Sequence, residues 1–416
     1  AAIEVEASRP FDLSHDLMLR ATVLSVSAQE YVLLLTLHHI ASDGWSMGIL
    51  LQELSALYNA ALRDEAAELN TLPVQYADYA LWQRNYLQGE VLQQQLDYWR
   101  HQLNALPVVH SLPLDKPRPS VASFSGDVQL HSLPLSVQEQ LRSLCQAQGA
   151  TLFMGVQALF AAFLSRYSGE RDIVMGTPSA NREQAEIAGL IGFFVNSLVL
   201  RSDIDPQQSL SGLIAASRQM LLEAYAHQQV PFEKVVEALQ PERSAGHSPL
   251  FQIMLSWQQG SDEGSLALDG LTVIPASSGS TQAKYELSLT AAESAEGLVL
   301  AWEYNTALFS GGRIARMAEQ FAVFAQALVQ SPALPLGQAP LLTEVEWLQL
   351  QSWHGKAEAL PGGCLHQLVE AQAEANPTAI AVVDGEQQLT YGELNAQANR
   401  LARYLREQRQ VQRETL

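Results

Sequence analysis

The chain has 416 residues, of which 47% are apolar, so it is long enough to bury a large core and to form two or three domains. Its net charge of −20, with lysine and arginine outnumbered and nowhere clustered, argues against nucleic acid or anionic lipid as a partner. Two cysteines, Cys145 and Cys364, are too few for a disulfide framework and wrongly spaced for a zinc site, which favours a reducing cytoplasm.

The ends of the chain carry no targeting signal that we recognise. No apolar run approaches the roughly 18 residues needed to cross a bilayer, and the first residues lack the basic and apolar regions of a signal peptide. We therefore expect a protein that is neither secreted nor membrane-bound. The chain also lacks an initiating Met and its last predicted helix stops abruptly, so we expect both ends to be cuts in a longer protein.

The first predicted elements flank a polar loop. Residues 31–37, YVLLLTL, form a continuous apolar run, which predicts a strand buried on both faces. Apolar residues between Met47 and Ala61 then recur at steps of three and four, which predicts an amphipathic helix. The loop between them, HHIASDGWSMG (38–48), therefore joins a strand end to a helix N-terminus, a place that commonly holds reacting groups. Two more helices are expected within residues 76–104.

A proline-spaced stretch, LPLDKPRPSVASFSG (112–126), predicts a boundary between two lobes. Beyond it, Ser136 and Glu139 form a capping-box pattern for a helix that ends at Gly149. Thr151 is the predicted cap of a second, strongly apolar helix. A strand at 172–176, the β-rich segments PLFQIMLSW, YELSLTA and GLVLAWEYN, and a helix near 312–330 complete an α/β lobe.

From residue 341 the composition changes to a polar linker, and the chain then starts a region of different character. A helix (HQLVEAQAEANP), a strand (AIAVVD), a turn at Asp384-Gly385 and the segment LTYGELNAQANRLARYLREQ predict the α/β beginning of another domain. The expected domains are the remainder of a first lobe (1–111), a second lobe (112–340), a linker (341–362) and the fragment of a further domain (363–416).

Adjacent histidines in the loop first suggest a metal site. Consecutive residues on a strand point to opposite faces, so His38 and His39 would share an ion only if the backbone turned between them. No HExxH or CxxC motif supplies further ligands. Two buried histidines that merely satisfy hydrogen bonds are the plainer alternative.

The same loop contains the pattern G-x-S-x-G, which is typical of the nucleophile elbow of serine hydrolases. A nucleophile elbow turns directly off the strand end, whereas here residues 40–43 intervene. Ser46 also stands where the helix needs an N-cap, and that role explains it without catalysis. A serine nucleophile remains open as one alternative.

The remaining interpretation gives the chemistry to a histidine. One imidazole at the strand end, beside Asp43 and the flexible Gly44, suits acyl transfer, because it can accept a proton from an attacking nucleophile. The helix N-terminus would then face the developing oxyanion. Asp43 would either orient the imidazole or anchor the loop by pairing with a cation elsewhere.

At this point the sequence resembles the condensation domains of nonribosomal peptide synthetases, relatives of chloramphenicol acetyltransferase. The HHxxxDG signature is followed, in the family's order, by YADYALWQR, IGFFVNSLVLR, HQQVPFEKVVEAL and ERSAGHSPLFQ. The segment LTYGELN (389–395) resembles the opening motif of an adenylation domain.

The resemblance implies an α/β fold of two chloramphenicol acetyltransferase-like lobes, the first incomplete here, with the active site in a tunnel between them. It implies amide formation between a donor acyl or peptidyl thioester and an acceptor aminoacyl thioester, each on the 4'-phosphopantetheine arm of a carrier domain. His39 matches the family's catalytic histidine; His38, Asp43, Gly44 and Asn196 match its supporting positions. Asn196 is also explained by a hydrogen bond that holds a strand in place. The motifs with Tyr76 and with residues 231–233 suit packing between lobes.

The chain departs from the family because it starts partway through the first lobe. The absent part includes the basic segment whose arginine typically pairs with the motif aspartate, so we expect Asp43 to lack its partner and the chain alone to be poorly active.

A third alternative for the function is a non-catalytic docking domain that retains the fold.

The resemblance also bears on subtype, partners and cofactors. Both motif histidines are intact, which argues against a heterocyclisation domain, and a following adenylation domain argues against an epimerisation domain. The sequence of the motif resembles that of domains that accept an L-configured donor. Upstream and downstream carrier domains and the protein's own adenylation domain are the expected partners. We expect no metal and no directly bound cofactor, and no ATP binding, because the fragment ends before any phosphate loop.

Overall fold

The computed structural model describes residues 3, 5–6, 9–242, 244–258, 266–274, 276, 281–355 and 362–412. They form two compact units, Ala1–Trp347 and Leu348–Leu416. Arg243 of the fifth motif, residues 356–361 of the expected linker and the last residues, 413–416, lie outside the described part of the chain.

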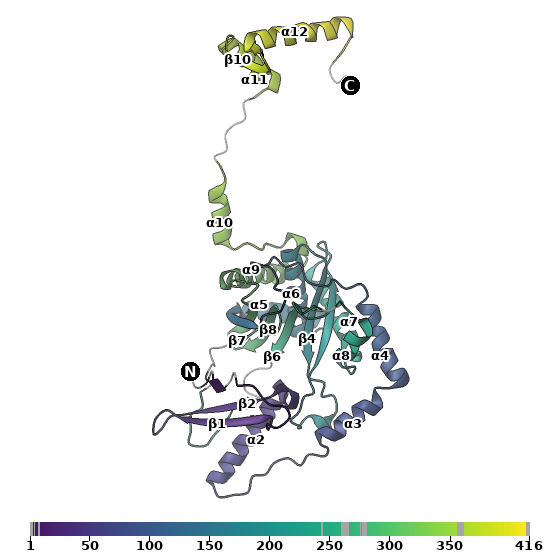
Figure 1. The fold of residues 1–416 in the computed structure, drawn as a ribbon, viewed down its shortest axis with the longest axis vertical. Coiled ribbons are helices and arrows are strands. Elements are labelled where there is room, and N and C mark those ends of the chain that lie inside the picture. The colour runs from purple at the N-terminus through teal and green to yellow at the C-terminus, as the bar shows by residue number, and fades with distance from the viewer. Residues whose placement is uncertain are drawn as a thin grey trace. The chain divides into compact units, whose positions relative to one another are not determined.

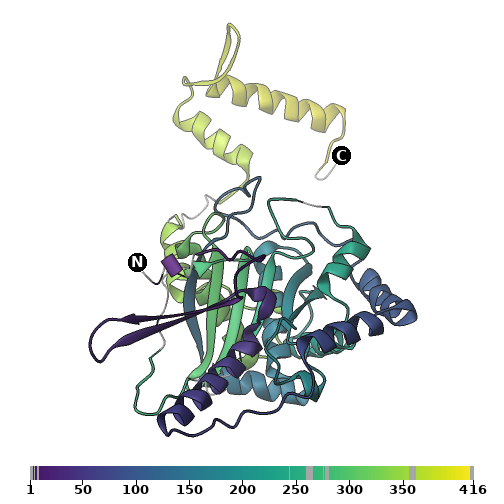
Figure 2. The same cartoon turned by 60° about the horizontal axis from the view of Figure 1, so that its bottom comes forward.

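The first unit begins with a small antiparallel hairpin, β1 (Leu19–Ser25) and β2 (Tyr31–Leu37). The predicted strand at 31–37 and the helix after it are confirmed, but the prediction that the strand is buried on both faces is wrong. Among the described strands β2 pairs only with β1, and Tyr31 and Leu33 on one of its faces are exposed. Figure 2 shows the hairpin reaching away from the rest of the unit.

Three helices follow the hairpin, and all three were predicted. They are α2 (Gly44–Leu62), α3 (Tyr76–Tyr86) and α4 (Gly89–Gln102), and a 3-10 turn, η1 (His39–Ala41), stands between β2 and α2. The motif loop therefore lies between a strand and a helix, as expected.

A seven-stranded mixed sheet forms the centre of the first unit, in the order β5-β4-β6-β8-β9-β3-β7. Among the described strands of this sheet, the pairs β4–β6 and β6–β8 are parallel and the other pairs are antiparallel. The strands are β3 (Ser125–Pro134), β4 (Asp172–Ser179), β5 (Asn196–Asp203), β6 (Ile253–Gln258), β7 (Thr281–Gln282), β8 (Leu287–Ser294) and β9 (Gly297–Asn305).

Four helices pack on one another beside this sheet (Figure 1). They are α5 (Leu135–Ala147), α6 (Leu152–Ser168), α7 (Leu210–Ala226) and α9 (Gly311–Gln330), and a shorter helix, α8 (Phe232–Leu239), packs on α4. Helix α6 is buried along most of its length, as its nearly continuous apolar sequence requires. Phe160, Phe163 and Trp302 join the helices to the sheet in the core.

Sequence patterns placed several of these elements correctly, but they did not single out β1, β3, β5, α7 or α8. Thr151 does cap α6, because its hydroxyl accepts a hydrogen bond from the Met154 N–H. The capping box at Ser136 is wrong: α5 begins one residue earlier, at Leu135, with Pro134 as its N-cap. Strand β3 was not predicted, because the inward-facing positions include polar residues such as Gln129 and obscure the alternation.

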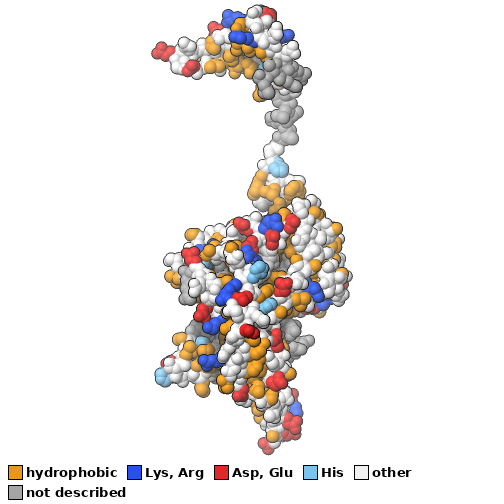
Figure 3. Space-filling model, turned by 90° about the vertical axis from the view of Figure 1, so that its right-hand side faces the viewer, with side chains coloured by type: hydrophobic (Ala, Val, Ile, Leu, Met, Phe, Trp, Pro, Cys, Tyr) orange, Lys and Arg blue, Asp and Glu red, His pale blue; other side chains and the backbone are white. Residues whose placement is uncertain are grey.

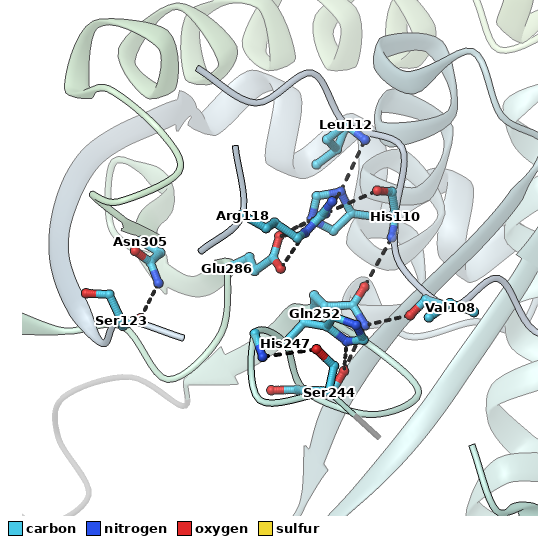
Figure 4. Close-up of polar contacts among 12 residues, drawn as sticks. Val108, His110, Leu112, Arg118, Ser123, Ser244, His247, Gln252, Glu286 and Asn305 are labelled. Atoms are coloured by element: carbon cyan, nitrogen blue, oxygen red, sulfur yellow. Dashed lines mark hydrogen bonds and ion pairs between the residues drawn. The ribbon is translucent and has the colours of Figure 1, made fainter. Parts of the chain in front are cut away.

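The connector between α4 and β3 is tied to the sheet by polar contacts (Figure 4). The Glu286 carboxylate accepts hydrogen bonds from His110 Nε2 (2.8 Å) and Arg118 Nε (2.9 Å). Gln252 accepts from the His110 N–H (3.1 Å) and donates to the Val108 carbonyl (3.2 Å). Side-chain hydrogen bonds therefore hold the connector against the sheet.

The second unit is small. It contains α11 (Leu365–Ala375), the antiparallel pair β10 (Ile380–Asp384) and β11 (Gln387–Thr390), and α12 (Tyr391–Gln408). The predicted helix, strand and turn are confirmed. Thr390 caps α12 in a capping box with Glu393. Helix α10 (Glu344–Trp353) spans the point where the two units divide, and η2 (Ala185–Ile187) and η3 (Leu336–Gln338) are short turns of the first unit.

On the face shown in Figure 3, acidic and basic side chains are interspersed with hydrophobic ones. Within the described residues no single helix meets the length and apolar composition of a membrane span, and only α5 and α6 meet them as a pair, with a 105° bend between them.

Candidate active site

The first motif histidine is engaged by the loop itself. His38 is the N-cap of η1, and its Nδ1 accepts a hydrogen bond from the Ile40 N–H at 3.1 Å. The ring of Phe11 packs against the His38 ring edge to face, with centroids 5.5 Å apart. These contacts give His38 a structural role in shaping the turn.

The second histidine presents one nitrogen outward. His39 Nδ1 lies 2.7 Å from the Ser42 carbonyl oxygen, and because a carbonyl only accepts, Nδ1 must carry the hydrogen. In the neutral imidazole Nε2 then bears the lone pair, and no group among the described residues bonds to it. His39 is exposed, and Phe193 packs edge to face against its ring at 5.1 Å. The geometry gives His39 an accessible proton acceptor.

Asp43 has a buried partner, so the expectation that it lacks one is wrong. Arg182 Nη2 lies 3.1 Å from Asp43 Oδ1, and each side chain is only 2% exposed. Burial alone would raise the pKa of the Asp43 carboxyl, but hydrogen bonds from Ser46 and Phe194 and the charge of Arg182 outweigh it and hold that pKa below its ordinary value. The arginine lies in the loop after β4, 139 residues further along the chain, where local spacing could not reveal it.

Ser46 is fully buried and serves the same network. Its Oγ lies 2.7 Å from Asp43 Oδ1 and 2.8 Å from Arg182 Nη2, and it accepts a hydrogen bond from the Gly192 N–H at 3.1 Å. The prediction that Ser46 is the N-cap is also wrong, because Asp43 caps α2 by accepting from the Ser46 N–H. A nucleophile has to reach its substrate, so the buried, fully bonded Ser46 does not fit the serine hydrolase alternative.

Gly44 and Asn196 have plain structural settings. Gly44 is the first residue of α2 and is exposed, and it does not take the positive φ that its flexibility would allow. Asn196 is buried and donates hydrogen bonds to the carbonyls of Gln228 and Val230, both at 2.8 Å, and accepts one from Phe232 N–H. These contacts tie β5 to the start of α8, as the strand-holding interpretation requires.

Three residues that sequence reasoning did not select complete the site. They are Arg182, the partner of Asp43; Phe193, against His39; and Trp45, whose indole N–H donates to the Ala188 carbonyl at 3.0 Å. Tyr76, predicted as a packing residue, donates its hydroxyl hydrogen to the Phe193 carbonyl at 2.7 Å. Phe193 lies inside a quoted motif, so its position was visible although its contact was not.

Among the residues that the structure describes, no three His, Cys, Asp or Glu side chains gather as a metal ion would need. A cavity of about 350 Å³ lies between α4, α8 and the connector, and its lining does not include His39.

Comparison with known proteins assigns the chain to a family. A condensation domain family model matches residues 1–351, and an AMP-binding enzyme family model matches residues 369–416. One of the linear gramicidin synthase subunits of Brevibacillus parabrevis is 43% identical over 406 residues, which cover 96% of this chain and 8% of that protein. Malpinin synthetase of Mortierella alpina is 43% identical over 405 residues, which cover 97% of this chain and 5% of that protein.

Solved structures agree with the sequence comparison. The X-domain from teicoplanin biosynthesis has a TM-score of 0.76 at 26% identity, over 81% of this chain and 77% of that one. A four-domain nonribosomal peptide synthetase bound to AMP and glycine has a similar fold, with a TM-score of 0.75 at 24% identity over 98% of this chain and 32% of that one. The chain thus spans a small part of its curated relatives, and it belongs to the condensation domain family, followed by the start of an AMP-binding domain.

Proposed function

We propose that this chain forms an amide bond between a donor acyl or peptidyl thioester and an acceptor aminoacyl thioester, each on the phosphopantetheine arm of a carrier domain. The observation that carries the proposal is the state of His39: its Nδ1 is held by the Ser42 carbonyl, and its Nε2 lone pair is open. Membership of the condensation domain family supplies the reaction class.

In the proposed reaction the acceptor amine attacks the donor thioester carbonyl. The new C–N bond forms, the C–S bond breaks, and the leaving thiolate takes up a proton. His39 Nε2 accepts the proton that the amine loses and can return it to the thiolate. A free α-amine has a pKa of about 7.7 to 8.0, so part of it is already neutral at pH 7. A base of this kind contributes about 10²- to 10⁴-fold, and orientation of the amine contributes beside it.

Asp43 is proposed to act on the loop and not on the proton. Its carboxylate oxygens accept from Ser46, Arg182 and the N–H groups of Phe194 and Val195, and none of these contacts involves the His39 ring. Gly44, exposed at the start of α2, leaves room for substrate beside the helix N-terminus. Asn196 is proposed to hold β5, and His38 to hold the turn.

The direct test mixes the full-length protein that carries this chain with a donor-loaded and an acceptor-loaded carrier protein. Intact-protein mass spectrometry then looks for a dipeptidyl acceptor. We expect product with the wild type and its loss in His39→Ala. His366→Ala, an exposed histidine in α11, is the matched control and should retain product. Product from His39→Ala at the wild-type level would contradict the proposal.

The serine alternative has its own test. A fluorophosphonate labels activated serine nucleophiles covalently, and we expect no label on Ser46, because that side chain is buried and bonded on every side. Labelling of Ser46 in the folded protein would contradict this assignment.

Docking without catalysis is the second candidate, because the X-domain from teicoplanin biosynthesis, 26% identical, was also solved in complex with OxyB. Carrier binding without dipeptide from any amino-acid pair would favour it. The further proposals are an L-configured donor, partner carrier domains upstream and downstream, a cytoplasmic location and no ATP binding by the adenylation fragment.

A further inference from the structure

The backbone of residues 192–195 is held by the motif loop of the first lobe. The Gly192 N–H donates to Ser46 Oγ at 3.1 Å. The N–H groups of Phe194 and Val195 both donate to Asp43 Oδ2, at 3.0 and 3.3 Å. The aspartate and serine of the motif therefore fix the position of a loop more than a hundred residues away.

Helix α3 holds the same loop from a second side. The Tyr76 hydroxyl donates to the Phe193 carbonyl at 2.7 Å. The Tyr76 ring lies against Gly192 so closely that a Cβ there would come within 2.4 Å of a ring carbon, which is why this position needs glycine. Phe194 packs against Tyr76 and is 2% exposed. The loop is thus fixed between α3 and the motif.

Phe193 is the exception within this fixed loop. Its side chain is 39% exposed, although both neighbouring residues are packed inward. The ring lies edge to face with the His39 imidazole, with centroids 5.1 Å apart and an angle of 82° between the ring planes. Packing of the core does not explain an exposed phenylalanine whose ring contacts one histidine.

His39 needs a second constraint. Its hydrogen bond to Ser42 engages Nδ1, but one hydrogen bond leaves the imidazole plane able to tilt about the Cβ–Cγ bond. A half turn would exchange nitrogen and carbon positions and direct a C–H group to the place of Nε2. The half turn is opposed by the Ser42 hydrogen bond, which it would break, whereas an aromatic ring in edge-to-face contact restrains the tilt of the imidazole plane, because such pairs favour one angle between the ring planes.

We propose that Phe193 is a positioning residue that sets the orientation of the His39 imidazole, and that Tyr76 holds Phe193 in place for this role. Asp43 and Ser46 of the motif hold the loop of residues 192–195, and Phe193 in that loop orients His39 of the same motif. This inference rests on the proposed function of His39.

The test follows the imidazole and the reaction separately. In the 416-residue chain labelled with ¹⁵N-histidine, the signal of His39 among the ten histidines is assigned by its loss in His39→Gln. We expect one tautomer, hydrogen on Nδ1, in the wild type and a mixture in Phe193→Ala. In the full-length protein we expect Phe193→Ala to lower kcat about three- to ten-fold, with KM for the loaded carriers little changed.

Conservative variants sharpen the test. Phe193→Tyr keeps the ring and should restore both the single tautomer and the rate. Tyr76→Phe should lower kcat in the same direction by about five-fold, because one hydrogen bond to the loop is lost. Tyr86→Phe is the matched control on α3, since the Tyr86 hydroxyl has no hydrogen-bond partner among the described residues; it should change neither readout.

Two outcomes would overturn the positioning role: an unchanged His39 signal in Phe193→Ala, or a loss that Phe193→Tyr shares equally. If Phe193→Ala fails to fold, Tyr76→Phe with an unaltered His39 signal and rate overturns it as well. A wild-type protein that makes no dipeptide contradicts the proposed function, whereas the tautomer readout still decides the orientation of His39.

Discussion

Two buried carboxylates of the first unit are paired with arginine in nearly the same way, yet they bind different parts of the molecule. Asp43 pairs with Arg182 beside the candidate active site, and Glu286 pairs with Arg118 on the connector between α4 and β3. The remaining lone pairs of Asp43 accept N–H groups of the loop that touches His39, whereas those of Glu286 accept from His110. The comparison indicates that the first pair couples stability to site geometry and that the second serves stability alone.

The charges of both carboxylates are favoured in the same manner. Burial would raise the pKa of Asp43 and of Glu286, but hydrogen bonds and the neighbouring arginine outweigh burial and lower both pKa values. Each group is therefore ionised in the folded protein at neutral pH, and each depends on its partners for that charge.

Removal of Arg182 is expected to have the largest effect. Arg182→Ala leaves the Asp43 carboxylate buried without its cation, and breaking a buried pair in this way costs about 3 to 5 kcal/mol. We expect the free energy of unfolding, measured by urea denaturation, to fall by that amount. The condensation rate should also fall in the fraction that remains folded, because the loop of residues 192–195 loses its anchor. Full activity in that fraction would contradict the coupling of the Asp43–Arg182 pair to the geometry of the site.

Neutralising the second carboxylate is expected to cost less. Glu286→Gln keeps the shape but removes the charge that Arg118 and His110 face, and Arg118 is partly exposed, so we expect a loss of about 1 to 3 kcal/mol in the free energy of unfolding. The condensation rate per folded molecule should stay at the wild-type level. A proportionate loss of rate would show that the connector also reaches the site.

The pH dependence should identify the Glu286 contribution. Its folded pKa is lowered, so its stabilisation is fully present above the unfolded pKa of glutamate, about 4.3, and is lost as pH falls through the folded value. We expect the difference in unfolding free energy between wild type and Glu286→Gln to be constant near pH 6 to 7 and to shrink below about pH 4. A difference that grows on acidification would contradict the sign of the shift.

The smallest effect is expected at Trp45. Its indole N–H donates to the Ala188 carbonyl, a second link between the motif and the loop after β4, but the side chain is exposed. Trp45→Phe should lower the free energy of unfolding by about 0.5 to 1 kcal/mol, measured by the same denaturation. A loss as large as that of Arg182→Ala would mean that the motif is anchored mainly by its tryptophan.

Local sequence patterns were sufficient for elements whose own residues determine them. The apolar run at 31–37, the helical stripe after Met47 and the Thr151 cap are all found in the structure. The order of the motifs was sufficient to identify the family. These features depend on short stretches of chain, where periodicity and capping rules apply directly.

Contacts between distant segments could not be predicted from the same patterns. Asp43 and Arg182 are 139 residues apart, and no local rule selects one arginine over another. Ser46 was the predicted cap for α2, but Arg182 and Gly192 engage its hydroxyl, and Asp43 caps the helix instead. Phe193 was visible in a motif, but its contact with His39 joins segments that are far apart in the sequence.

The most direct test of the central claim is a single-turnover measurement of transfer from a loaded donor carrier to a loaded acceptor carrier at pH 7, with the wild type and His39→Ala in the full-length protein. If His39 Nε2 accepts the proton of the attacking amine, the rate should fall by about 10²-fold or more in the variant while loaded carriers still bind. Equal rates for the two proteins would contradict the assignment of the chemistry to His39.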